Sequence, residues 1–237
     1  MSIPETMQAI LLTGYGGLDR LKVVDDHPVP VPDEGEVLIE VGAAGVNNTD
    51  INTRTGWYAQ SVTGGTGEGA ADGYGDVDTG KSSWSGAALT FPRIQGADVC
   101  GRIVAAGSKT DEGRIGERVL VQSMQPQEPD ENGLAILTFG ADFDGGFAEY
   151  AVAKSDMTLS VESLLSDVEL ASFPCAYSTA ENMLERIGLG EGETVLITGA
   201  SGGVGSAAVQ LAKRRGAHII AVASRSKHDF VTGLGAD

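Results

Sequence analysis

The sequence predicts a mixed fold, in which a mostly β domain is followed by an α/β domain with a parallel sheet. Up to residue 155, short apolar runs alternate with glycine- and proline-rich turns, which is typical of β-strands. Residues 193–227 then contain strand, glycine-rich turn, helix and strand in that order. We therefore expect two domains, residues 1–155 and residues 156–237.

The first domain is predicted to consist mainly of strands, at residues 7–12, 21–24, 36–46, 99–106, 117–122 and 145–153. Residues 47–55 are polar and predict a short helix or a turn. Residues 59–90 are rich in glycine and have too few apolar side chains to form a core. They are either a lid over a substrate cleft or a surface insertion.

The second domain is predicted to begin with helices at residues 166–173 and 177–187, the first with a capping box formed by Ser166 and Glu169. Residues 194–198 are apolar without alternation, which predicts a parallel strand in mid-sheet, buried on both faces. A helix at 204–215, ended by Gly216, leads to a second strand at 217–223 and a helix at 227–234.

The turn after the strand at 194–198 has the composition of a dinucleotide-binding loop. Gly199 permits a tight exit, and Gly205 lets the helix pack closely on the sheet. The positive end of the helix dipole and its free N–H groups favour a pyrophosphate. Glycine turns also occur without a ligand, but two flanking apolar strands favour binding. The predicted nucleotide-binding residues are Gly199, Ser201, Gly202, Gly203, Val204 and Gly205.

The residues after the second strand predict the coenzyme. An NAD site usually presents Asp or Glu about 20 residues after the glycines. Here the chain has Ser224, Arg225 and Lys227, which suit the 2′-phosphate of NADP. We therefore predict NADP(H) as cofactor, with a solvated basic loop as the alternative.

Composition limits the partners. A formal charge of −17 argues against binding nucleic acid or an anionic membrane. The two cysteines, Cys100 and Cys175, form no disulfide framework and suit a reducing compartment. No signal peptide or membrane-spanning run is recognisable. We expect a cytoplasmic protein that acts on a small-molecule substrate, with a homodimer as one option for its oligomeric state.

Five further motifs, together with the glycine turn, resemble those of the medium-chain dehydrogenase/reductase superfamily, and in particular its quinone oxidoreductase-like branch. They are EVLIEV at 36–41, GVNNTD at 45–50, GADVCG at 96–101, GERV at 116–119 and GGFAEY at 145–150. The resemblance implies a β-rich, GroES-like catalytic domain followed by the first βαβ part of a Rossmann domain. It also implies an active site between the domains and hydride transfer from a nicotinamide.

The resemblance also bears on zinc. The zinc alcohol dehydrogenases carry cysteine at the position of Asn47 and a His-Glu pair at Ala97 and Asp98. Cys175 matches the remaining cysteine ligand, but a single thiolate cannot hold zinc. The four-cysteine structural lobe is missing as well, because residues 122–143 contain no cysteine. We therefore predict no metal site.

In the zinc-free branch, polar side chains hydrogen-bond the substrate oxygen, and Asn47 and Tyr58 stand at the matching positions. Thr179 matches a threonine near the nicotinamide, whereas Asn52 replaces a second family tyrosine. Each residue also has a structural interpretation. Asn47 and Asp50 favour helix capping, Tyr58 can anchor the insertion, and Thr179 can simply pack.

The resemblance implies an NADPH-dependent, zinc-independent oxidoreductase that transfers hydride to a quinone, an enone or a related carbonyl compound. One alternative is a non-catalytic nucleotide-binding fragment, and another is an alcohol dehydrogenase with an atypical metal site. Dinucleotide-binding sheets of this type have six strands, whereas only two are expected here. We therefore expect either a fragment of a longer polypeptide or a chain completed by a partner.

Overall fold

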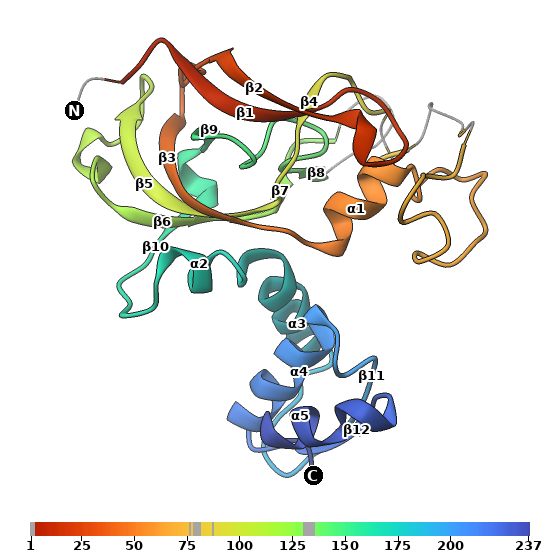
Figure 1. Ribbon diagram of the computed structural model, residues 1–237. Helices are drawn as coiled ribbons and strands as arrows, with labels where there is room; N and C mark the ends of the chain where they lie inside the picture. Colours follow the sequence, from red (N-terminus) through yellow and green to blue (C-terminus); the bar gives the residue numbers. More distant parts are fainter. Residues whose placement is uncertain (1–2, 76, 78–81, 87, 130–135) are drawn as a thin grey trace. The chain divides into compact units, whose positions relative to one another are not determined.

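The computed structural model describes residues 3–75, 77, 82–86, 88–129 and 136–237 (Figure 1). The chain divides into two compact units, Met1–Pro174 and Cys175–Asp237. This division falls later than residue 155, because β10 (Thr158–Ser160) pairs with a strand of the first unit and α2 (Asp167–Leu170) packs on two others. The assignment of residues 1–155 and 156–237 to a catalytic and a coenzyme-binding domain remains a prediction.

The first unit is built on an antiparallel five-stranded sheet with strand order β10-β6-β5-β3-β9 (Figure 1). Its other members are β3 (Glu36–Gly45), β5 (Asp98–Ala106), β6 (Arg118–Val121) and β9 (Tyr150–Lys154). A second sheet has the order β2-β1-β4, with β1 (Thr6–Leu12), β2 (Leu21–Pro28) and β4 (Arg93–Ile94). β7 (Met124–Pro126) and β8 (Ile136–Thr138) form a two-stranded ladder. Single 3₁₀ turns occur at Leu18–Arg20, Glu112–Arg114 and Ser155–Met157.

Alternating apolar residues of these strands form the core of the first unit. The buried cluster of the large sheet comprises Val37, Ile39, Val99, Ile103, Val119, Val121, Phe139, Ala151 and Ala153. Each large aliphatic side chain buried in this way stabilises the fold by roughly 1.5–3 kcal/mol. The predicted strand at 145–153 begins only at Tyr150, because the N–H groups of Gly145 and Phe147 donate to the carbonyls of Ile94 and Gln95 instead of to the sheet ladder.

Helix α1 (Asn48–Thr55) follows β3, as the polar segment at 47–55 predicted, and ends at Gly56, whose φ is 78°. Arg54 is only 5% exposed and donates to Gly16 O (2.5 Å) and Ala70 O (2.7 Å). Trp57 Nε1 donates to Gly64 O (2.9 Å). These bonds attach the first part of the glycine-rich segment to α1. Residues 76, 78–81 and 87 of that segment lie outside the described residues, and the choice between lid and surface insertion remains a prediction.

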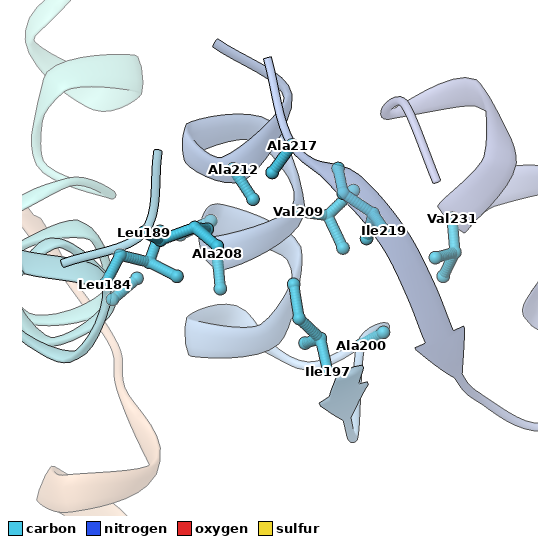
Figure 2. Close-up of a cluster of buried hydrophobic side chains, with 12 residues drawn as sticks. Leu184, Leu189, Ile197, Ala200, Ala208, Val209, Ala212, Ala217, Ile219 and Val231 are labelled. Carbon is cyan, nitrogen blue, oxygen red and sulfur yellow. The ribbon is translucent and has the colours of Figure 1, made fainter. Parts of the chain in front are cut away.

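The second unit contains the predicted β-α-β arrangement. β11 (Thr194–Thr198) and β12 (His218–Val222) pair in parallel, and α4 (Gly203–Arg214) connects them. α3 (Pro174–Arg186) precedes β11, and a 3₁₀ turn (Arg225–Lys227) and α5 (His228–Gly233) follow β12. Figure 2 shows the apolar cluster that joins these elements, including Ile197, Val209 and Ile219. The predicted capping box of Ser166 and Glu169 is confirmed at the start of α2, in the first unit.

The prediction that residues 194–198 are buried on both faces is wrong for the described part of the chain. Leu196 is 62% exposed and its partner Ile220 is 55% exposed. The reason is that α4 packs on the face that carries Ile197 and Ile219, whereas Leu196, Ile220 and Val222 lie on the opposite face. The two strands are therefore half-buried.

Within the described residues, none of the helices has the length and apolar character that crossing a membrane would require.

Candidate functional site

The first turn of α1 carries the predicted catalytic residue Asn47. Asn47 is the N-cap of this helix, and its Oδ1 accepts a hydrogen bond from the N–H of Thr49 (3.3 Å). Its own backbone N–H donates to Oδ2 of Asp50 (2.8 Å), which completes a capping box. The structural interpretation of Asn47 and Asp50 as capping residues is therefore confirmed, and a catalytic role of Asn47 stays a prediction.

Asp50 fastens this turn to the start of β5. Its side chain is 5% exposed, and Oδ1 accepts from the N–H groups of Gly96 (3.1 Å) and Ala97 (3.2 Å). Burial raises the pKa of the Asp50 carboxyl to about 6, in spite of three backbone hydrogen bonds that favour the carboxylate, and the charge of Asp98 adds to the increase. Asp50 thus fixes the backbone on which Asn47 stands.

We expect Asp50→Asn to lower the free energy of unfolding by about 1–3 kcal/mol, because its amide nitrogen would face a buried N–H donor. In a chain of this size the melting temperature should fall by roughly 2–12 °C. The pH dependence is a second signature. Since the folded pKa of Asp50 lies above the ordinary 3.8, its protonation stabilises the fold, and this contribution is lost as the pH rises through about 6. The difference in free energy of unfolding between the wild type and Asp50→Asn should therefore be larger near pH 4 than at neutral pH.

The control is Asp111→Asn, since the exposed Asp111 accepts from Gly113 N–H (2.8 Å) in a surface turn and should tolerate the change. Equal melting temperatures of wild type and Asp50→Asn, measured by calorimetry, would contradict the structural role of Asp50.

The amide of Asn47 is held in one orientation. Nδ2 donates to Oδ2 of Asp98 (3.2 Å), a side chain only 2% exposed, while Oδ1 accepts the N–H of Thr49. A carboxylate only accepts and an N–H only donates, so the amide cannot exchange its two ends. One hydrogen of Nδ2 remains available to a ligand oxygen.

The side chains around Asn47 indicate whether zinc could bind at this position. At the positions that the family resemblance relates to zinc ligands, the side chains are the amide of Asn47, the methyl of Ala97 and the carboxylate of Asp98. Such a set does not fit zinc, which needs at least three N, S or carboxylate ligands. Among the residues that the structure describes, no three His, Cys, Asp or Glu side chains gather in a metal-binding arrangement. The absence of zinc stays a prediction.

Tyr58, the second predicted catalytic residue, reaches the same helical turn. Its hydroxyl donates to Oγ1 of Thr49 (3.1 Å), and its ring makes an edge contact with Trp57 at a centroid distance of 5.4 Å. Thr49 thereby links Asn47 and Tyr58. Sequence reasoning did not single out Thr49, because only its place in the GVNNTD motif marks it, and nothing in the sequence pairs it with a tyrosine nine residues later.

A cavity of about 390 Å³ lies elsewhere in the first unit, lined by apolar residues such as Met7 and Ile94 and by Gln125, Tyr150 and Lys154. None of the predicted site residues lines this cavity. It therefore gives no support to the prediction at α1. The candidate site is instead defined by the hydrogen-bonded side chains at the first turn of α1.

The glycine turn of the second unit has the expected geometry. Gly199 has φ of 60°, and a Cβ on Gly205 would lie 2.2 Å from Gly199 O, so the helix packs against the turn too closely for any side chain. On the outer side, Gly202 and Gly203 are exposed, and a Cβ on Gly203 would approach only Ala176 Cβ, at 3.8 Å. The backbone at these two glycines is accessible, as the approach of a pyrophosphate requires.

The start of α4 offers N–H groups to an anion. Gly202 is the N-cap, and the N–H of Ser206 is bonded to Gly202 O (2.8 Å). The N–H groups of Gly203, Val204 and Gly205 come before Ser206, the first residue whose N–H finds an acceptor within the helix. Ser201, just before the N-cap, is half-buried. This part of the turn fits a phosphate group.

The basic segment emerges at the same edge of the sheet as the turn. Thr198 pairs with Val222 at the carboxyl ends of β11 and β12, and Ala200 N–H donates to Val222 O (3.1 Å). The side chains that follow β12, namely Ser224, Arg225 and Lys227, are exposed. Thr179 lies half-buried on α3, one turn after Ala176, whose Cβ a side chain at Gly203 would meet at 3.8 Å. The structure thus gathers the predicted coenzyme-binding residues around one edge.

Comparisons with known proteins find relatives along nearly the whole chain. Residues 33–163 match the family model "Alcohol dehydrogenase GroES-like domain". The quinone-oxidoreductase homolog of Spinacia oleracea chloroplasts is 34% identical, over 98% of this chain and 60% of its own length. An alcohol dehydrogenase candidate from Sinorhizobium meliloti 1021 is 47% identical with a TM-score of 0.83, over 99% of this chain and 62% of that one. The quinone oxidoreductase of Coxiella burnetii is 31% identical with a TM-score of 0.73, over 98% and 61%.

The chain thus spans about three fifths of the length of the relatives that it matches, 60% of the Spinacia protein and 62% of the Sinorhizobium structure.

Proposed function

The chain belongs to the alcohol dehydrogenase GroES-like family of the medium-chain dehydrogenase/reductase superfamily. From this premise we propose that it is, or is part of, an NADPH-dependent, zinc-independent reductase of quinones, enones or related carbonyl compounds. One observation carries the choice among the activities of that superfamily. Tyr58, Thr49 and Asn47 are joined by hydrogen bonds at the first turn of α1, where relatives with zinc would hold the metal.

Bound NADPH would supply a hydride, and the electron pair displaced in the substrate would then appear on its carbonyl oxygen. Tyr58 can give that oxygen a proton, and the remaining Nδ2 hydrogen of Asn47 can donate a hydrogen bond. Asp98 is bonded to the same amide, and its negative charge would repel a lasting oxyanion. Proton transfer from Tyr58 is therefore favoured over stabilisation by hydrogen bonds alone.

The name of one relative also favours NADPH and an enone-type substrate. A relative from Arabidopsis thaliana, 29% identical over all of this chain and 52% of its own length, is named NADPH-dependent alkenal/one oxidoreductase. We propose NADPH instead of NADH for this chain because Ser224 can donate to a 2′-phosphate and Arg225 and Lys227 can neutralise it. We also propose a small-molecule substrate and a cytoplasmic location.

We expect Arg225→Ala to weaken NADPH binding by roughly ten- to a hundredfold, the effect of losing a hydrogen bond to a charged group. NADH binding should stay nearly unchanged, because NADH lacks the 2′-phosphate. Titration of both coenzymes by calorimetry measures the two affinities. Arg214→Ala is the control, since Arg214 is an exposed cation in the last turn of α4. Equal losses for both coenzymes, or a wild type that prefers NADH, would show the assignment to be wrong.

The proposed activity is tested by following NADPH consumption across a panel of quinones and enones, combined with elemental analysis. We expect turnover with a zinc content far below one atom per chain. Nucleotide binding without turnover on any substrate would favour a non-catalytic nucleotide-binding role. Turnover of alcohols that disappears on chelation would instead favour an alcohol dehydrogenase with an atypical metal site.

A further inference from the structure

Thr49 contacts both side chains that the proposed function places at the substrate oxygen. Its N–H donates to Oδ1 of Asn47 (3.3 Å), and its Oγ1 accepts from the hydroxyl of Tyr58 (3.1 Å). The capping box fixes the backbone of Thr49, and the edge contact with Trp57 limits the position of the Tyr58 ring. A hydroxyl group both donates and accepts, and its hydrogen rotates freely. The Thr49–Tyr58 hydrogen bond can therefore run in either direction without movement of the backbone.

We propose that Thr49 is a positioning residue that allows Tyr58 to act as proton donor, an inference that rests on the proposed function. In the structure Tyr58 donates to Thr49. When a substrate oxygen approaches, the Tyr58 hydrogen turns toward it, and the Thr49 hydroxyl donates to the Tyr58 oxygen instead. The same two residues stay bonded throughout.

NADPH, when bound, would supply the hydride for the new C–H bond of the substrate, and the π electrons of the substrate would move to its oxygen. The O–H bond of Tyr58 breaks, its proton joins the substrate oxygen, and the electron pair remains on the Tyr58 oxygen. Thr49 stabilises this phenolate with a charge-assisted hydrogen bond, and a proton from water then restores the phenol.

The charges near Tyr58 determine how much the Thr49 hydrogen bond contributes to stabilising the phenolate. The carboxyls of Asp50 and Asp98 are both hydrogen-bonded to Asn47 and disfavour a further negative charge nearby. The N-terminus of α1 acts in the opposite sense, because its dipole favours an anion at the first turn, where Thr49 lies. The Thr49 hydroxyl is the group seen to contact the Tyr58 oxygen, so its hydrogen bond offsets the two carboxyls most directly.

The test is Thr49→Val in the complete native polypeptide, with turnover, coenzyme affinity and melting temperature measured together. Valine keeps the N–H that bonds Asn47 and removes only the hydroxyl. We expect kcat to fall roughly ten- to a hundredfold, the loss for a hydrogen bond to a charged group. NADPH affinity should not change, and Thr49→Ser should restore kcat. Thr55→Val is the matched control on the same helix, because that hydroxyl bonds Asn52 O (3.2 Å).

A double variant separates this inference from the proposed function. Because Thr49 acts through Tyr58, Thr49→Val should slow the wild type but not the Tyr58→Phe enzyme. If Tyr58→Phe lowers kcat and Thr49→Val does not, the inference fails and the proposed function stands. If Tyr58→Phe leaves kcat unchanged, Tyr58 is not the proton donor and the inference about Thr49 fails, while the observed turnover still supports a reductase. If neither the wild type nor any variant consumes NADPH, the proposed function itself fails. If Thr49→Val lowers the melting temperature and coenzyme affinity along with kcat and serine does not rescue it, Thr49 is merely structural, and the inference is overturned.

Discussion

Replacing Tyr58 with phenylalanine is expected to lower kcat by roughly ten- to a thousandfold, with little change in NADPH affinity. The hydroxyl that donates to Thr49 in the structure is the group proposed to protonate the substrate oxygen. Its loss removes an interaction made in the transition state, so kcat falls instead of KM rising. The ring remains, and with it the edge contact to Trp57. Steady-state kinetics with saturating NADPH measures the effect.

The control for this variant is Tyr74→Phe. The Tyr74 hydroxyl also donates a hydrogen bond, but to Gly65 O within the glycine-rich segment. Its loss should leave kcat unchanged. If Tyr58→Phe also turns over at the wild-type rate, Tyr58 serves only to pack against Trp57 and to anchor the following segment.

Gly205→Ala is the second variant with a large expected effect. The new Cβ would lie 2.2 Å from Gly199 O and 2.8 Å from Ala200 Cα, which are backbone atoms that cannot turn away. The start of α4 would have to move off the turn, at a cost of about 1–3 kcal/mol in the free energy of unfolding. The same movement displaces the N–H groups proposed to hold the pyrophosphate. We expect NADPH affinity to fall by more than about tenfold, measured by titration beside thermal unfolding.

Two further alanine variants separate packing from coenzyme contact. At Gly203 a Cβ has room, so the fold should keep or slightly gain stability, since alanine favours a helix by about 0.5–1 kcal/mol. NADPH binding should nevertheless weaken, because the methyl group would occupy the exposed side proposed for the pyrophosphate. Gly233 lies in α5 and a Cβ there also has room, so its replacement should likewise keep or slightly raise stability but leave NADPH affinity unchanged. Unchanged NADPH affinity in Gly203→Ala would show that the phosphate does not lie there.

A strand could be predicted from the sequence where its run of apolar residues was long enough to be recognised. β1 and β3 carry several apolar residues each and were found from sequence, whereas β4, β7, β8 and β10 have only two or three residues. Such short strands are defined by their partners, as Arg93 and Ile94 are by β1. The exposure of Leu196 shows a second limit. An apolar run predicts a strand, but whether both faces are buried depends on which elements cover them.

In the candidate site, contacts between neighbouring residues could be predicted from the sequence, whereas contacts between distant residues could not. The N-cap of Asn47 and the positive φ of Gly199 depend on neighbouring residues, so residue types alone indicated them. The bond from Gly96 N–H to Asp50 crosses 46 positions in the chain. No spacing rule connects such residues, and the fold must exist before they meet.

The bonds of Arg54 have a consequence for how the length of this chain can vary during evolution. Its guanidinium is nearly inaccessible to water and is held by carbonyls 38 residues before it and 16 residues after it. A deletion that removed Ala70 would leave part of a buried cation without an acceptor, which costs more than losing an ordinary hydrogen bond. Deletions that reach Ala70 should therefore be selected against, because they remove an acceptor of a buried guanidinium.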